Sequence, residues 1–311
     1  MVDRSEDENI DEQIADGFFP IRTVSNITGV NAITLRAWER RYGLVKPVRT
    51  PKGHRLFTQK DIDLIQRVVE QLEKGISIGQ VRARLAGEVV EEGRGGETDV
   101  WAGYQRRMLN AVARFDVQSL DAAYNEALSL YPVDMVTMRL IMPLLHALGE
   151  RWQAAEGSVS EEHFFGAYLR NKLGARFHHH PVTHGPKLIA ACLPGERHEN
   201  GLMLFCLSAL ARGFQVVLLG ADMPLLELAT TVGRARADAI LLSGALDPPP
   251  GTMSNDLSGL VVAGKVPVFV GGGVSVRFND EIMRAGAISL GTDIAAGLAR
   301  IETTLGSRLR L

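Results

Sequence analysis

Apolar residues recur at helical spacing through the first part of the chain, and glycine and proline interrupt them at short intervals. One helix face is marked by Ile62, Ile65, Val69 and Leu72. A shorter helix before it turns Leu35 and Trp38 inward and ends at Gly43. Prolines and a glycine between residues 47 and 53 predict a short hairpin. The pattern therefore predicts a small helical domain with a hairpin over residues 18–85.

The middle of the chain has a different texture, with few glycines and no alternation typical of strands. Four helices fit this part, at about 99–114, 116–130, 133–154 and 160–177. Expected linkers flank them: residues 86–98 are rich in Gly and Glu, and residues 178–185 are rich in His. Residues 99–177 are therefore expected to form a four-helix bundle.

After residue 185 short apolar runs alternate with helical stretches. Buried strands are expected at Lys187–Leu193, Gln215–Gly220, Ala239–Ser243, Pro267–Val270 and Ala287–Leu290. This alternation predicts a doubly wound α/β domain over 186–311, with a parallel, flavodoxin-like (Rossmann) sheet covered on both faces. Such sheets bind ligands at the carboxyl ends of their strands.

Composition narrows the class of protein. Hydrophobic residues make up 46% and charged residues 23% of the chain, which excludes global disorder. No apolar run is long enough to span a bilayer, and no basic segment precedes an apolar core at the N-terminus. Two cysteines cannot form a disulfide framework, so we expect the protein to reside in a reducing cytoplasm.

Charge is distributed unevenly along the chain. Residues 1–16 carry seven acids and one Arg, which predicts a disordered acidic arm over 1–17. Residues 20–60 carry nine Lys and Arg against one Glu. A strongly basic region inside a near-neutral chain indicates contact with a polyanion.

The basic region supplies side chains of the kinds that hold phosphates and bind guanine edges. These candidate DNA-binding residues are Thr34, Arg36, Arg40, Arg41, Arg49, Lys52, His54 and Arg55. The string ITLRAWERRYGLVKPVRTPKGHRLFTQKDI resembles the MerR family of winged-helix regulators over residues 18–85. The resemblance implies that the helix enters the major groove of promoter DNA and that the hairpin, the wing, grips the backbone. MerR proteins usually continue into a long coiled coil, whereas a Gly- and Glu-rich linker follows here, so assembly is expected to depend on the later domains.

Three polar or small-residue motifs follow the expected strands of the last domain. They are Glu196-x-His198-x-x-Gly201, Ser243-Gly244 and Gly271-Gly272-Gly273. A histidine in the first loop projects above the sheet edge, where its neutral nitrogen can bind a metal. We expect Gly201 to let the following helix approach closely, and the other glycines to leave room for a ligand tail.

Together and in this order, these motifs resemble the cobalamin-binding domain. The resemblance implies that His198 is the lower axial ligand to cobalt, and that a slot lined by the Ser243 and glycine motifs takes the nucleotide tail of the cofactor. It also implies that Glu196, which stands where the family has Asp, holds the other ring nitrogen of the histidine. Ala245 replaces the Leu of the family's Ser-x-Leu motif.

The string RWQAAEGSVSEEHFF adds a further likeness to this family. Its Trp152, Glu162 and His163 resemble the W-(x)9-E-H pattern of helical caps that cover the upper face of the corrin. The resemblance implies that the Trp packs on an adenosyl or methyl group and that the Glu and His bond ribose hydroxyls. In the similar CarH/LitR group of cobalamin-dependent photoreceptors, a His directly after the Trp ligates cobalt in the light state; here that position is Gln153, a poor cobalt ligand.

The order of winged helix, helical bundle and cobalamin fold resembles the CarH/LitR group of cobalamin-dependent photoreceptor regulators over residues 18 to about 305. The resemblance implies a cytoplasmic transcriptional repressor rather than an enzyme. It implies adenosylcobalamin as cofactor, with methylcobalamin as the alternative. It also implies a homo-oligomer, dimer or tetramer, that binds promoter DNA in the dark and dissociates in light.

Two other interpretations stay open. The bundle and sheet would also suit a corrinoid-carrying subunit of a methyltransferase or mutase, although the winged-helix segment argues against it. A MerR-type regulator could instead work without cobalamin, under the control of a partner protein or another tetrapyrrole.

Overall fold

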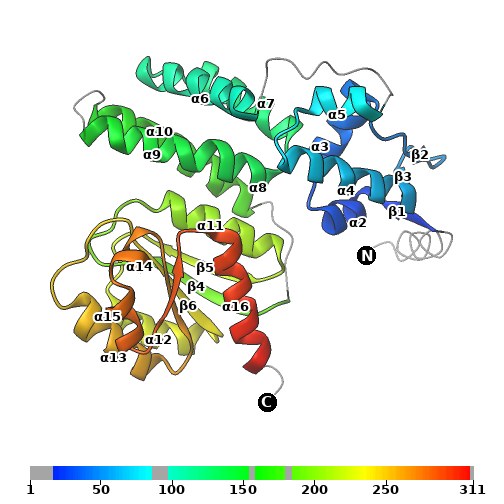
Figure 1. The fold of residues 1–311 in the computed structure, drawn as a ribbon. Helices are drawn as coiled ribbons and strands as arrows, with labels where there is room; N and C mark the ends of the chain where they lie inside the picture. The colour runs from blue at the N-terminus through cyan, green and yellow to red at the C-terminus, as the bar shows by residue number, and fades with distance from the viewer. Residues whose placement is uncertain (1–16, 86–96, 154–157, 179–183, 309–311) are drawn as a thin grey trace. The chain divides into compact units, whose positions relative to one another are not determined.

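The computed structural model describes residues 17–85, 97–153, 158–178 and 184–308 (Figure 1). Most of the expected acidic arm and of the two expected linkers lies outside these residues. Glu97 and Thr98, expected in the first linker, begin a helix instead. The chain divides into two compact units, Met1–Glu162 and His163–Leu311.

The first unit begins with a winged-helix fold. Its elements are β1 (Phe18–Pro20), α2 (Ile21–Thr28), α3 (Ala32–Ala37), the π-helical turn η1 (Trp38–Tyr42), β2 (Val48–Arg49), β3 (Arg55–Thr58), α4 (Gln59–Glu73) and α5 (Ile78–Leu85). The strands form an antiparallel sheet in the order β1-β3-β2. The hairpin of β2 and β3 confirms the expected wing, whereas strand β1 was not expected.

Local signals in the sequence explain the bounds of these helices. The Asn31 side chain accepts a hydrogen bond from the Thr34 amide at 2.9 Å and so caps α3. Gly43 ends η1 in the left-handed conformation, with a φ of 60°. The expected inward position of Leu35 and Trp38 is confirmed, since both are fully buried. In α4 the buried face contains Val68, which was expected only on its flank, while Val69 is partly exposed.

Helices of the bundle follow in the same unit. They are α6 (Glu97–Ala113), α7 (Val117–Leu130), α8 (Val133–Val136), the π-helical turn η2 (Thr137–Ile141) and α9 (Met142–Gln153). The last bundle helix, α10 (Val159–His178), crosses into the second unit at His163. All four expected helices are confirmed, the third as the continuous run α8–η2–α9.

Helix α3 packs against α7 by its buried face. The Trp38 indole donates a hydrogen bond to the Leu130 carbonyl at 2.9 Å. The Thr34 hydroxyl donates to the Leu128 carbonyl at 3.0 Å. These bonds satisfy carbonyls at the C-terminus of α7, which have no partner within their own helix.

The second unit contains a parallel five-stranded sheet. Its elements after α10 are β4 (Lys187–Cys192), α11 (Asn200–Ala211), β5 (Gln215–Gly220), α12 (Leu225–Ala235), β6 (Ala239–Ser243), η3 (Thr252–Asp256), α13 (Leu257–Gly264), β7 (Val268–Gly271), α14 (Gly273–Arg277), α15 (Asn279–Arg284), β8 (Ile288–Gly291) and α16 (Ile294–Arg308). The strand order is β5-β4-β6-β7-β8 with every pairing parallel. This is the flavodoxin-like order expected from the sequence.

Helices cover both faces of the sheet (Figure 1). Helices α11 and α16 pack together on one face, and α12, α13 and α15 cover the other. The order of the strands reverses between β4 and β6, and in such sheets the crevice at the reversal binds the ligand. The loops that follow these two strands carry the His198 and Ser243-Gly244 motifs.

Neither cysteine of the second unit is in a disulfide. Cys192 and Cys206 are both free and buried. Burial raises the pKa of Cys192 to about 12, so this thiol stays protonated and unreactive. Within the described residues no helix combines the length and apolar character needed to cross a membrane.

Candidate functional site

Most of the expected DNA-binding cations are exposed on α3, η1 and the β2–β3 hairpin, which we call the winged surface. Arg36, Arg40, Arg41, Lys52 and His54 are all exposed. Arg36 and Arg40 lie one turn apart on the outer face of α3 and η1, because residues four apart in a helix share a face. This is the arrangement that a groove-binding helix needs, with cations directed away from the core.

Thr34 corrects one expectation. It was expected to be exposed on the polar face of the helix, but its side chain is completely buried. Its hydroxyl bonds the Leu128 carbonyl, so in this structure Thr34 holds α3 against α7. The sequence did not reveal this because the partner, Leu128 on α7, is 94 residues away in the chain.

Ile33 is an exposed residue of the same helix that was not among the predicted DNA-binding residues. It is 66% exposed and lies one turn before Arg36. An apolar side chain among cations on a groove-facing helix is suited to contact thymine methyl groups. The sequence could have indicated this residue, because it lies three positions before Arg36 and so shares its helix face.

Arg49 and Arg55 differ from the other cations because both bind a carboxylate. Arg49 Nη2 lies 2.9 Å from Glu39 Oε1, and Arg55 Nε lies 2.5 Å from Glu39 Oε2. Burial alone would raise the pKa of Glu39, but the hydrogen bonds from the two guanidinium groups outweigh it and lower the pKa below its ordinary value. Glu39 was not among the expected site residues, since it was counted only as the one acid in a basic region.

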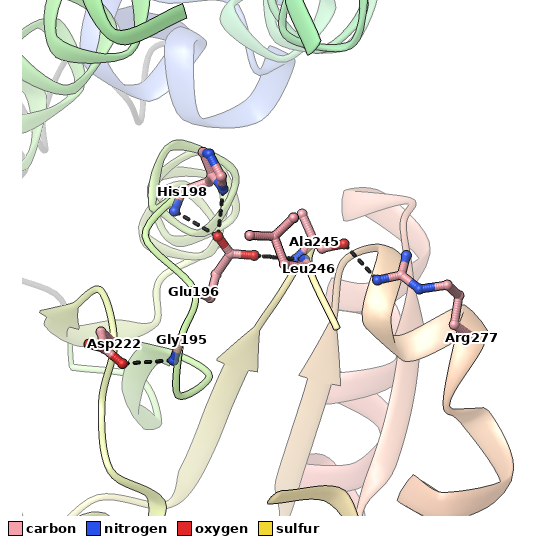
Figure 2. Close-up of polar contacts among 7 residues, drawn as sticks. All are labelled: Gly195, Glu196, His198, Asp222, Ala245, Leu246 and Arg277. Atoms are coloured by element: carbon pink, nitrogen blue, oxygen red, sulfur yellow. Dashed lines mark hydrogen bonds and ion pairs between the residues drawn. The ribbon is translucent and has the colours of Figure 1, made fainter. Parts of the chain in front are cut away.

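The edge of the parallel sheet brings His198 and Glu196 together (Figure 2). His198 Nδ1 lies 2.7 Å from Glu196 Oε1, and the same oxygen accepts the His198 backbone N–H at 2.8 Å. A carboxylate on Nδ1 assigns the proton to that nitrogen and leaves the lone pair on Nε2. The His198 side chain is 53% exposed, whereas that of Glu196 is 2% exposed.

Glu196 also reaches the loop after β6. Its Oε2 accepts the backbone N–H groups of Ala245 at 2.6 Å and Leu246 at 3.0 Å (Figure 2). Burial alone would raise the pKa of Glu196, but its hydrogen bonds to the His198 ring and to backbone amides lower the pKa to about 2. The carboxylate is therefore ionised throughout the ordinary pH range and joins the two loops at the strand reversal.

Neighbouring contacts fix these loops further. Arg277 donates to the Ala245 carbonyl at 2.7 Å and to Asp247 Oδ1 at 2.9 Å, so the loop after β6 is held from both sides. Asp222, after β5, accepts the Gly195 amide at 2.7 Å (Figure 2). The loop that bears His198 is thus bonded to the loops that follow both neighbouring strands.

The glycines of the later motifs allow close backbone packing between β6 and β7. A Cβ on Gly272, whose φ is 85°, would lie 2.5 Å from the Gly244 carbonyl oxygen. A Cβ on Gly244 would lie 2.9 Å from the Leu193 side chain. Gly272 therefore requires glycine, because its overlap is with backbone, whereas at Gly244 the Leu193 side chain would have to shift.

Gly201 corrects a second expectation. It was expected to let α11 approach the sheet, but a Cβ at this position would meet no heavy atom of the described residues within 4 Å. Its φ also lies outside the left-handed region. Neither packing nor backbone strain in this structure requires a glycine here, three residues after His198.

The expected cap residues lie at the junction of the last two bundle helices. Trp152 is in the final turn of α9, and its side chain lies outside the described residues, as does that of Gln153. Glu162 and His163 lie in the first turns of α10, and His163 is exposed. One turn further, the Gly166 carbonyl accepts the Asn200 side-chain amide at 3.2 Å.

A second contact joins α10 to the loop that bears His198. Arg170 forms an ion pair with Glu199, the residue that follows His198. Gly166 and Arg170 lie one turn apart and contact the consecutive residues Asn200 and Glu199. The part of α10 that belongs to the second unit is therefore anchored to the residues that follow His198.

These residues fit a corrinoid. One imidazole with its lone pair on Nε2 suits a metal whose equatorial positions are filled by a macrocycle. The His198 side chain is 53% exposed, so the imidazole is accessible from solvent. Glu196 supplies the second-shell contact that fixes the ring of a metal-bound histidine.

Comparison with known families gives matches to the winged-helix domain and to the bundle. Residues 19–88 match the MerR HTH family regulatory protein description, and residues 104–176 match the B12 binding domain. The second match corresponds to the bundle helices.

Two proteins of Myxococcus xanthus are similar over most of the chain. The HTH-type transcriptional repressor CarH is 29% identical over 270 residues, which cover 83% of this chain and 90% of that protein. The HTH-type transcriptional repressor CarA is 28% identical over 256 residues, which cover 81% and 85%.

A solved structure agrees with the fold of the bundle and sheet. The monomethylamine corrinoid protein of Methanosarcina barkeri superposes with a TM-score of 0.54 over 65% of this chain and 99% of that chain, at 19% identity. At this identity the likeness concerns the fold. The chain combines a MerR-type helix-turn-helix domain with a B12 binding domain and is homologous to the transcriptional repressors CarH and CarA over most of its length.

Proposed function

We propose that this chain is a DNA-binding repressor of transcription whose operator binding is controlled by cobalamin. One observation carries the proposal: the chain that presents a basic winged-helix surface also fixes a half-exposed imidazole at the switch point of a flavodoxin-like sheet. A histidine oriented by a buried carboxylate is suited to bind a metal, and the winged surface is suited to bind DNA.

The cofactor-binding residues fall into three groups with different roles in this proposal. His198 would hold the cobalt through Nε2, and Glu196 would keep the ring oriented. The tail slot is lined by Ser243, Gly244, Gly271, Gly272 and Gly273, and Gly201 belongs to the motif of His198. Trp152, Glu162 and His163 contact the upper ligand.

The DNA-binding roles divide between the groove and the backbone. Arg36, Arg40 and Arg41 extend from the recognition helix and its continuation toward base edges and phosphates. Lys52 and His54 contact the backbone from the turn of the wing. Arg49 and Arg55 take part in the wing and its ion pairs with Glu39.

Control follows from differential binding, because a ligand shifts a conformational equilibrium only if it prefers one arrangement. Adenosylcobalamin, the form we propose, supplies a cobalt–carbon bond that light can break. The cap residues contact the upper ligand, so their arrangement depends on whether that ligand is present. We propose that the arrangement with the ligand exposes the surface for a homo-oligomer, which binds promoter DNA in the cytoplasm through several winged helices.

The test is DNA binding by the full chain with and without adenosylcobalamin, in the dark and after green light. A duplex is first selected from a random library by the wild-type protein. The visible spectrum and the size in solution are recorded on the same samples. His198→Ala is compared with His184→Ala, because His184 is an exposed histidine that precedes β4, at the opposite edge of the sheet.

We expect adenosylcobalamin to increase specific binding by the wild type and by His184→Ala but not by His198→Ala. Equal binding with and without the cofactor by all three proteins would leave a cobalamin-independent regulator. Cofactor uptake together with substrate-dependent methyl transfer, and no specific DNA binding, would favour the corrinoid-carrying enzyme subunit.

A further inference from the structure

The wing of the first unit contains two arginines in an unfavourable pairing. Arg49 on β2 lies directly opposite Arg55 on β3 in the antiparallel register. Like charges directly opposite each other destabilise a strand pair. Strand β2 has only two residues, so few ladder bonds are available to offset this repulsion.

Glu39 lies between the two arginines and binds both. One carboxylate oxygen accepts from Arg49 and the other from Arg55, at 2.9 and 2.5 Å. The side chains of Glu39 and Arg55 are only 18% and 19% exposed, and that of Arg49 is 51% exposed. The partly buried Arg55 pair is the one that solvent and salt screen less.

Glu39 belongs to the same helical run as the candidate groove contacts. It lies on η1, which continues α3, and it immediately precedes Arg40. Its ion pairs therefore connect the element proposed for the groove to both strands of the element proposed for the backbone. The angle between the two elements decides whether both reach DNA at once.

We propose that Glu39 is a positioning residue that fixes the wing against the recognition helix. The proposal rests on the proposed DNA-binding function and assigns a favourable role to an acid on a surface that binds a polyanion. It also changes the role of Arg55, whose Nε is engaged by Glu39 and which acts mainly as the anchor of the wing.

Charge alone gives the opposite expectation, and this makes the proposal testable. Removing an acid from a DNA-binding surface strengthens binding to any duplex, because repulsion of phosphates is lost. Removing the anchor of the wing weakens binding to the selected duplex, because wing and helix no longer dock together. Glu39→Gln keeps the size of the side chain and separates the two effects.

The first measurement does not involve DNA. Hydrogen exchange in the full chain is followed for peptides that span the wing, 48–58, and helix α4, 59–73. The wing holds backbone bonds from the Thr50 amide to the His54 carbonyl at 2.9 Å and from the Gly53 amide to the Thr50 carbonyl at 2.8 Å. We expect Glu39→Gln to raise exchange in the wing at least fivefold and to leave α4 unchanged.

The second measurement is affinity for the selected duplex and for an unrelated duplex of equal length. We expect Glu39→Gln to bind the selected duplex about tenfold more weakly and the unrelated duplex no more weakly than the wild type. The matched control is Glu70→Gln, which removes an exposed acid of α4 and carries the same change in charge. We expect the control to lower neither affinity.

A double-mutant cycle tests whether Glu39 acts through Arg55. If it does, Glu39→Gln and Arg55→Gln together cost less than the sum of the single changes. Additive effects of opposite sign would mean that Arg55 binds phosphate on its own, and would overturn the proposal.

The outcomes separate this proposal from the proposed function. Faster exchange in the wing of Glu39→Gln, with no specific DNA binding by any variant, would support the anchor and overturn the repressor. Unchanged exchange, or binding of the selected duplex by Glu39→Gln as tight as by Glu70→Gln, would overturn the anchor while the repressor stands.

Discussion

Glu39 in the winged-helix fold and Glu196 at the sheet edge are carboxylates that each hold two structural elements together, but they do so in different surroundings. Glu39 keeps 18% of its side chain in solvent and binds two charged guanidinium groups. Glu196 keeps 2% and binds one imidazole and three backbone amides. Water can replace much of what Glu39 loses if its partners leave, whereas at Glu196 it cannot do so without opening the loops.

The difference shows what each end of the chain requires. DNA binding draws on many exposed cations, so the loss of one contact leaves the others in place. The metal binding that we propose would depend on one imidazole, and one carboxylate sets the orientation of that ring. The sheet edge is therefore expected to be far less tolerant of substitution than the winged surface.

The largest expected effect is that of Glu196→Gln. An amide group has one acceptor oxygen in place of two, and its NH2 would face backbone N–H donors. We expect a loss of about 3 kcal/mol in the free energy of unfolding, since hydrogen bonds to a buried charge are lost. Cobalamin affinity is expected to fall roughly 10- to 100-fold, as for other outer partners of metal-binding histidines.

Urea unfolding and a cobalamin titration measure these effects, and Glu39→Gln is the matched change at the less buried carboxylate. We expect Glu39→Gln to cost about 1 kcal/mol or less. Equal losses of unfolding free energy in the two variants would contradict the contrast between the fully buried and the partly buried carboxylate.

The next largest effect is expected for Gly272→Ala. The position has a φ of 85°, and its Cβ would lie 2.5 Å from the Gly244 carbonyl oxygen. We expect a loss of about 2 kcal/mol from strain and overlap, measured as a lower urea midpoint with an unchanged slope. A midpoint like that of the wild type would show that the β6 and β7 edges can separate, and the tail slot would then not be rigid.

The sequence predicted the framework of both regions better than their fine contacts. The bundle helices and parallel strands were predictable because core positions must be apolar. The spacing of apolar residues therefore indicates which element they form. The prediction that Thr34 is exposed was wrong because periodicity places it on a polar face. Its burial depends on α7, more than 80 residues later in the chain. Glu196 was expected to hold His198, but its bonds to Ala245 and Leu246 join two loops that only the fold brings together.

Cations and histidines stand out in a sequence, whereas the acid that positions them does not. Glu39 looked like an isolated charge because its partners Arg49 and Arg55 come from two different strands of a hairpin. Gly201 was predicted to let the following helix approach the sheet, and the structure does not support this reason for a glycine. A spacing identifies a residue type, but only the packing shows which neighbour requires it.

Gly201→Ala is expected to have a smaller effect on stability, and one of opposite sign to that of Gly272→Ala. It lies in α11, where a Cβ would meet no described heavy atom within 4 Å. Alanine in a helix is favoured over glycine by about 0.5–1 kcal/mol, so the cofactor-free chain should become more stable. If Gly201 lines the cofactor site, as its place three residues after His198 suggests, the added methyl group should lower cobalamin affinity. A variant that is more stable and binds cobalamin as well as the wild type does would show that Gly201 does not line the cofactor site.

The smallest expected effect is the acid sensitivity of the Glu39 ion pairs. The pKa of Glu39 is lowered in the folded chain, so its stabilising contribution is complete above the pKa of the unfolded chain, 4.5, and is lost as pH falls through the lower folded value. Between pH 5 and pH 3 the wild type should therefore lose slightly more unfolding free energy than Glu39→Gln does. The difference should shrink at high salt, because the exposed Arg49 pair is screened. Urea unfolding at both pH values, in low and high salt, measures it. A larger loss in Glu39→Gln than in the wild type would mean that the carboxylate is not stabilised in its ionised form, and the contrast with Glu196 would then be one of kind and not only of burial.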